Sequence, residues 1–182
     1  MRHTNRLSVL GSVLGMLLLL LACSLAIAQD VRTNYMPGTD FSVYKTYKWV
    51  AIEGAKYPNQ ILDQQIKDAV NSQLAAKGFT LATGDKADLY VAYQVAIQNQ
   101  QQWNAYGMGG VRWGGGMGTA TSSTIQIGTL DVDFYGPAQQ KLLWQGAATK
   151  TLNPSKDPAK NQARLNQAVA KLLKNFPPGA NK

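Results

Sequence analysis

Apolar and polar residues alternate through residues 87–97, ADLYVAYQVAI, more regularly than anywhere else in the chain. Every second position carries a leucine, β-branched or aromatic side chain: Leu89, Val91, Tyr93, Val95 and Ile97. A period of two places these side chains on one face of a strand. We therefore expect a central strand with that face in the core.

Two stretches instead repeat their apolar residues every three or four positions, which predicts amphipathic helices. The first covers residues 59–77, with Asn59 as its N-cap and Gly78 after its end. In the second, Asp157 caps the helix and Pro158 opens it. The two apolar stripes are Leu62, Ile66, Ala69, Val70 and Leu74, then Leu165, Ala168, Val169, Leu172, Leu173 and Phe176.

Further extended segments precede and follow the central strand. They are residues 31–35, 44–52, 79–82, 120–135 and 141–152. The resulting order β-β-α-β-β-β-β-α predicts an α+β fold. We expect a mostly antiparallel sheet of five to six strands, with both helices on one face. Val91 and Val95 should then meet Val70 of the first helix and Leu172 of the second.

Glycines in two of these strands bear on how their side chains face. In residues 120–135 the apolar parity changes across Gly128, and a bulge there would direct both sets of side chains into the core. In residues 141–152, Leu142 and Trp144 should face the core. Gly146 and Ala148 are small, which indicates a close approach by another element.

Residues 98–118 interrupt the regular pattern. Gln98–Gln102 is wholly polar, and the glycine-rich loop 103–118 contains seven glycines with no phosphate-loop spacing. The same loop holds the residue types enriched where proteins meet partners: Trp103, Tyr106, Met108, Arg112, Trp113 and Met117. We treat these six as candidate partner contacts. The alternatives are a merely mobile loop, or aromatic side chains that fold back on the end of the sheet.

The first 28 residues have the features of a secretory signal peptide. Arg2 and Arg6 precede a long apolar run, and Ala26-Ile27-Ala28 fits the small-residue rule for cleavage before Gln29. The segment around Cys23 also resembles a bacterial lipobox, in which Cys23 would be acylated. A third alternative is an uncleaved anchor. Residues 29–182 would in each case form a single α+β domain outside the cytoplasm, and we favour simple cleavage.

Composition narrows the chemistry of that domain. The only histidine and the only cysteine, His3 and Cys23, lie in the first 28 residues. Residues 29–182 therefore lack the groups needed for Ser-His-Asp or Cys-His catalysis, His or Cys zinc sites, and disulfides. Nothing in the sequence indicates a cofactor. Asp131 and Asp133 could hold a hard cation or act as an acid and base, but solvated strand residues are the simpler interpretation.

Several short motifs, taken in order, resemble one known family. They are Asp40-Phe41, residues 44–49 (YKTYKW), residues 76–79 (AKGF), residues 87–93 (ADLYVAY), residues 143–146 (LWQG) and residues 175–177 (NFP). Together they resemble the bacterial envelope proteins grouped as domain of unknown function 4136 (DUF4136), whose members are often described as lipoproteins. The resemblance implies a compact α+β domain in the bacterial envelope and supplies no catalytic residue.

We therefore expect a non-enzymatic exported protein of the periplasm or of the periplasmic face of the outer membrane, a binding or structural module. Its partner would be an envelope protein or polymer and not nucleic acid, and it would contact a membrane only through an acylated Cys23 or an uncleaved signal. One alternative is a hydrolase of envelope polymers that uses Asp, Tyr or Lys. Another is binding of acidic polymers, because cleavage leaves a net charge of +6, with 16 basic and 10 acidic residues.

Overall fold

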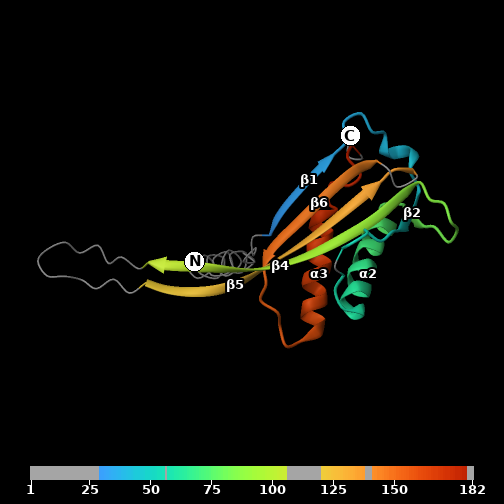
Figure 1. Ribbon diagram of the computed structural model, residues 1–182. Coiled ribbons are helices and arrows are strands. Elements are labelled where there is room, and N and C mark those ends of the chain that lie inside the picture. The colour runs from blue at the N-terminus through green and yellow to red at the C-terminus, as the bar shows by residue number, and fades with distance from the viewer. Residues whose placement is uncertain (1–28, 56, 106–119, 138–140, 180–182) are drawn as a thin grey trace, which may run out of the picture.

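The computed structural model describes residues 29–55, 57–105, 120–137 and 141–179. A six-stranded sheet carries two long helices on one of its faces (Figure 1). The elements are β1 (Asp30–Tyr35), the 3-10 turn η1 (Phe41–Val43), β2 (Thr46–Trp49), α2 (Gln60–Ala76), β3 (Thr80–Leu81), β4 (Leu89–Ala105), β5 (Ala120–Tyr135), β6 (Leu142–Thr151) and α3 (Pro158–Leu172). This order confirms the expected α+β fold.

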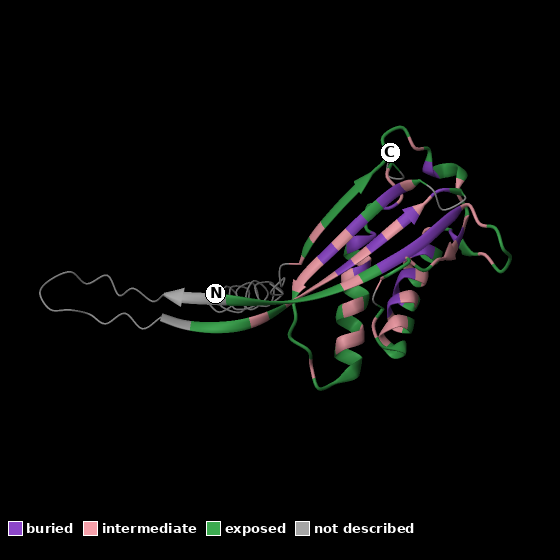
Figure 2. Ribbon diagram, viewed as in Figure 1, coloured by how far each residue is buried: buried purple, intermediate pink, exposed green. Residues whose placement is uncertain are grey.

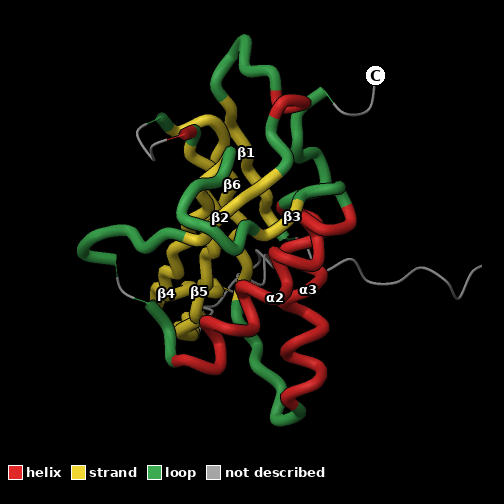
Figure 3. Tube along the Cα trace, turned by 90° about the vertical axis from the view of Figure 1, so that its right-hand side faces the viewer, coloured by secondary structure: helices red, strands yellow, loops and turns green. Residues whose placement is uncertain are grey.

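The strands lie in the order β1-β6-β5-β4-β2-β3. The four strands β1, β6, β5 and β4 pair antiparallel with their neighbours in the sheet. β2 pairs parallel with both β4 and β3. The parallel pairs arise because α2 connects β2 to the strands after it, as a crossover connection requires. Figure 3 shows α2 and α3 side by side against the same side of the sheet, where they contact each other.

Both helices begin where the sequence predicts, and α2 also ends there. α3 instead ends at Leu172, so Phe176, the last residue of the predicted stripe, lies beyond the helix. The Asn59 side chain accepts a hydrogen bond from the Leu62 N–H (3.0 Å). Past the end of α2, Gly78 has φ +83°, a conformation that glycine adopts without strain. The Asp157 side chain accepts from the Ala159 N–H (2.9 Å), with Pro158 in the first turn of α3.

The core lies between the sheet and the two helices. Val70, Val91 and Leu172 are buried in one cluster, and Val95 is partly buried against it, so both helices and the central strand contribute to the same core. Ile97 continues the same alternation but is 61% exposed. β2 pairs with β4 only as far as Val91, so β4 runs on beyond the packed layers.

Gly146 allows α3 to approach the sheet closely. A Cβ atom at this position would lie 2.4 Å from the Trp144 ring and 2.8 Å from Leu172 Cδ1. Ala148, two residues further along β6, is also buried. The small side chains in this strand therefore mark a real close contact, as the sequence indicated.

One expectation about strand facing is wrong, and a second is only half right. β5 has no bulge at Gly128, since its pairing with Ile97 on one side and Lys150 on the other runs on without a break. Ile125 and Ile127 instead lie on the face opposite the core and stay partly exposed. The irregularity falls between Phe134 and Tyr135. Across from it in β6, Trp144 is buried as expected, but its neighbour Leu143 is buried and Leu142 is only half-buried.

The polar composition of Gln98–Gln102 suggested that the central strand ends before this stretch, but the sheet continues through it. β4 continues through it to Ala105, and every residue keeps a partner in β5, ending with Ala105 opposite Ala120. Backbone hydrogen bonds between strands do not depend on apolar side chains. An exposed pair of strands can therefore be rich in glutamine, serine and threonine.

Candidate interaction site

The extension of β4 and β5 forms a two-stranded arm, which we define as residues 98–105 and 120–127. It projects from the body of the domain past the ends of the neighbouring strands (Figures 1 and 2). β6 pairs with β5 only as far as Ile127, and β2 leaves β4 at Val91. The described side chains of the arm are exposed, apart from the half-buried Ile125 and Ile127. No residue of the arm is charged, proline or glycine.

Of the six candidate partner-contact residues, the structure describes only Trp103, which lies near the far end of this arm. Trp103 belongs to β4 and pairs with Ser122, so the stretch 103–105 is strand and not loop. The other five candidates, Tyr106, Met108, Arg112, Trp113 and Met117, lie outside the described residues, as does the candidate lipidation site Cys23. The structure thus places Trp103 in a projecting element, which the glycine content of the segment did not indicate.

Asp131 and Asp133 lie on the open face of the sheet, opposite the helices. In β5 they flank the buried Val132, which points into the core. Burial raises the pKa of both carboxyl groups, and the Asp131 charge raises that of Asp133 further. The Tyr135 hydroxyl donates to Asp133 Oδ2 at 3.3 Å. No described lysine or arginine forms an ion pair with either carboxylate.

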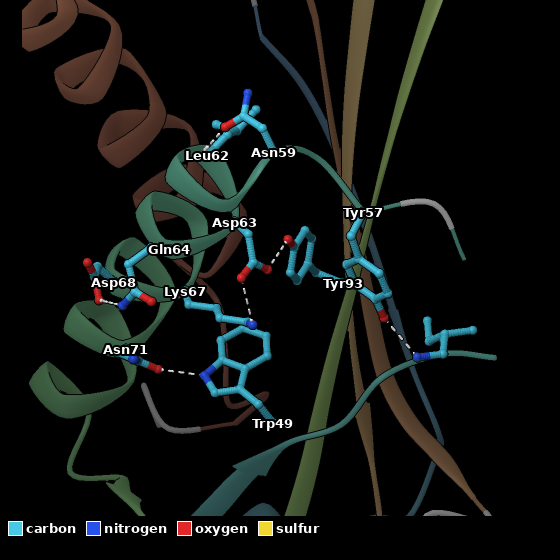
Figure 4. Close-up of polar contacts among 11 residues, drawn as sticks. Trp49, Tyr57, Asn59, Leu62, Asp63, Gln64, Lys67, Asp68, Asn71 and Tyr93 are labelled. Atoms are coloured by element: carbon cyan, nitrogen blue, oxygen red, sulfur yellow. Dashed lines mark hydrogen bonds and ion pairs between the residues drawn. The ribbon is translucent and has the colours of Figure 1, made fainter. Parts of the chain in front are cut away.

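A polar network that the sequence did not reveal joins α2 to the sheet (Figure 4). The Tyr93 hydroxyl donates to Asp63 Oδ1 at 2.5 Å, and Lys67 Nζ lies 2.9 Å from Asp63 Oδ2. One turn further along α2, Asn71 Oδ1 accepts hydrogen bonds from Trp49 Nε1 and from the Tyr47 hydroxyl, both 2.9 Å long. The only sequence signals were a tyrosine, not a phenylalanine, at a buried strand position and an asparagine beside the apolar stripe of α2.

This network stabilises the packing of α2 and does not resemble a catalytic centre. The Tyr93 hydrogen bond is the largest cause of a lowered pKa at Asp63. Burial, with the Asp63 carboxylate, raises the pKa of the Tyr93 hydroxyl, which makes this phenol a poorer acid. A neutral phenol that donates to a carboxylate fixes geometry, and a nucleophile would need the opposite shift.

The contributions of Asp63 and Asp133 to stability should change with pH in opposite directions. The Asp63 pKa is lowered on folding, so its stabilising effect is present above the ordinary Asp value of about 3.9 and is lost as the pH falls through the folded value. Tyr93→Phe should therefore lower the free energy of unfolding at pH 7 by about 1 kcal/mol, after allowance for the partial exposure of Asp63. The difference from the parent should shrink at pH 3.

The charge on Asp133 has the opposite effect on stability from the charge on Asp63. A carboxyl group whose pKa is raised on folding destabilises the folded state as the pH rises past the ordinary value. Asp133→Asn should therefore stabilise the protein at pH 7 and leave it unchanged at pH 3. Urea unfolding of both variants at the two pH values measures both effects, and differences that do not change with pH would contradict them.

The described residues enclose no deep cavity. Four depressions open on the surface of the described residues, and the one lined by Tyr47, Asn71 and Phe79 measures about 460 Å³. Asp131 and Asp133 line none of these four. Over the described ranges, no three His, Cys, Asp or Glu side chains gather as a metal site. No helix in this part of the chain is long and apolar enough to span a membrane.

Comparison with known families gives one match. The family model described as "Domain of unknown function (DUF4136)" matches residues 31–178. No curated protein sequence matches the chain significantly.

Several solved structures share elements of the architecture. A PDZ domain protein from Parabacteroides distasonis is 15% identical with a TM-score of 0.55, and the match covers 82% of this chain and 36% of that one. The chain thus spans about a third of that protein. The PelC dodecamer from Paraburkholderia phytofirmans is 14% identical over 80% of this chain and 95% of PelC, with a TM-score of 0.48. A DUF330 protein from Xanthomonas campestris is 13% identical over 80% and 88%, with a TM-score of 0.38. At these identities, the first match shows a likeness of fold alone.

Proposed function

This chain belongs to the DUF4136 family, and we propose that it is a non-enzymatic exported protein of the bacterial cell envelope, a binding or structural module whose contact element is the arm. The projecting arm carries the proposal. An N-terminal segment with the features of a signal peptide supports the compartment. The protein would be attached to a membrane only if Cys23 is acylated or the signal is retained.

The arm contributes little to the stability of the domain. Its eight residue pairs run from Gln98 opposite Ile127 to Ala105 opposite Ala120, and β6 pairs with β5 only at the first of them, at Ile127. Ordering a residue costs about 1–2 kcal/mol of backbone entropy, and an isolated two-stranded hairpin is at best marginally stable in water. Such an element is best explained by what it contacts, and residues of the types enriched at partner contacts follow it in the sequence, between Ala105 and Ala120.

A hydrolase of envelope polymers is the competing proposal, with Asp131, Asp133 and Tyr135 as its reactive groups. The raised pKa values of the two carboxyl groups favour it. Their placement argues against it, because residues two apart on a strand point the same way and do not flank a bond between them, as paired glycosidase carboxylates do.

Shortening the arm tests the proposal. An Asn-Gly turn replaces residues 101–124 and joins Gln100 to Ile125, which are paired in the sheet. Gln126 is kept, because its carbonyl accepts the Leu152 N–H at 2.7 Å. We expect a melting temperature within a few degrees of the parent and the loss of envelope components that co-purify with the tagged parent protein.

The matched control keeps the arm and removes both charges from the open face, as Asp131→Asn with Asp133→Asn. It should retain the co-purifying components. Unchanged capture by the shortened protein would contradict the proposal. Loss of capture only in the double Asp variant would favour the open face, and with it the competing hydrolase.

A further inference from the structure

The arm presents a long strand edge without a partner, and we propose that a second copy of this chain pairs with it. The two β4 strands would run antiparallel about a two-fold axis and join the two sheets into one. This inference rests on the proposed function of the arm and names its partner.

The edge follows from the pairing of β4. The Val50 N–H donates to the Val91 carbonyl at 2.8 Å, so Val91 directs its backbone groups away from β5 and toward β2. Backbone direction alternates along a strand. Ile97, Asn99 and Gln101 therefore also direct their N–H and C=O groups away from β5, at a level that β2 does not reach. Nothing in the described part of the chain bonds to them.

The other edges of the sheet are protected against such pairing. On the outer strand β1, Asp30 and Arg32 form a 3.0 Å ion pair on an exposed surface. At the opposite edge, β3 is only two residues long. Charges, prolines, bulges and short length are the usual protections of an edge strand. Residues 95–105 of β4 have none of them.

The chemistry of the edge favours an identical partner. After cleavage the chain carries a net charge of +6, and two copies repel wherever their basic surfaces meet. Residues 95–105 are uncharged, so like copies can meet there without that repulsion. The exposed residues Gln98–Gln101 are amides, each with both a donor and an acceptor, so the same side chain can pair with itself across a two-fold axis.

Pairing would also relieve the weakness of the arm itself. Two exposed strands are marginally stable, whereas a four-stranded sheet formed from two arms satisfies the free backbone groups of both β4 strands. The contact is isologous, since the same surface of each copy is used. It closes on itself and leaves no free β4 edge for a third copy.

Sedimentation equilibrium of the purified protein from about 1 to 100 µM tests the inference, and we expect a dimer. Asn99→Pro removes one outward N–H without removing a bond to β5, as proline on an open edge does. This variant should be monomeric with unchanged melting, and Asn99→Ala, which keeps the N–H, should remain a dimer. A parent that is monomeric throughout this range, or a dimeric Asn99→Pro variant, overturns the inference.

A disulfide scan provides a second measurement that does not depend on proline. In a Cys23→Ser background the chain has no other thiol. Single cysteines are placed at Gln94, Ala96, Gln98, Gln100 and Gln102. Facing residues at these positions do not exchange hydrogen bonds across the axis and lie about 4.5–5.5 Å apart at Cβ. Crosslinking should peak at the residue nearest the axis and fall on both sides, and equal or absent crosslinking at all five overturns the inference.

The two proposals fail in different ways. A monomeric protein whose arm still captures an envelope component would remove the second copy as partner and keep the proposed function. A dimeric protein whose shortened arm still captures envelope components would remove the arm as the contact element for those components and keep the second copy as its partner.

Discussion

Phe176→Ala should lower the free energy of unfolding by about 3–5 kcal/mol. This side chain is 1% exposed and lies at the centre of an aromatic cluster. Its ring stacks on Phe134 at a centroid distance of 4.2 Å and meets Trp144 at 5.2 Å, Phe79 at 5.6 Å and Phe41 at 5.8 Å. Truncation would remove one partner from four aromatic contacts and leave a cavity that these rigid rings fill poorly.

Urea unfolding of the parent and variant measures this effect. Phe176→Leu keeps much of the buried volume and should lose less than half as much as the alanine variant. Tyr35→Ala removes an aromatic ring that is 51% exposed and should cost less than about 1 kcal/mol. A loss below 1 kcal/mol for Phe176→Ala would show that the chain after α3 does not close the core.

Local sequence signals were sufficient to predict the helices and strands and their order along the chain. Asn59 and Asp157 form the predicted caps because a side-chain oxygen needs only the N–H groups two or three residues ahead. The alternation that begins at Leu89 identifies the core face of β4 through Val91 and Tyr93, since a strand with one face in a core has a fixed period. These features depend on neighbours in sequence.

Register was not predictable in the same way. The bulge expected at Gly128 and the core position expected for Leu142 both came from parity within one strand. The structure places the irregularity at Phe134 and Tyr135 and buries Leu143 in place of Leu142. Which residues face each other depends on the partner strand, and a single strand's pattern does not contain that information.

In the candidate site, too, local features were predictable from the sequence and contacts between distant segments were not. Polarity suggested that the central strand ends before Gln98, but β5 supplies partners for β4 as far as Ala105. The Tyr93–Asp63 contact joins residues 30 positions apart, so neither residue's local pattern predicts it. Among the candidate partner contacts, composition pointed to Trp103, and only the topology shows that it lies in a projecting arm.

Leu172→Ala should lower the free energy of unfolding by about 2–5 kcal/mol, at the upper end of that range. Leu172 is 1% exposed, and its Cδ1 atom sits where a Cβ at Gly146 would be only 2.8 Å away. Gly146 has no side chain that could move into the space left by truncation. A compensating Gly146→Ala exchange would not refill it cleanly, because the new Cβ would also lie 2.4 Å from the Trp144 ring.

Ile61→Ala is the matched control for Leu172→Ala, because it shortens a branched helix side chain that is 73% exposed. It should change the free energy of unfolding by no more than about 0.5 kcal/mol. The contrast separates burial from helix propensity, since alanine is the better helix former at both positions. Chemical denaturation of the two variants side by side gives the comparison. Equal small changes would mean that α3 does not rest on β6, and both helices could then not share one face of the sheet.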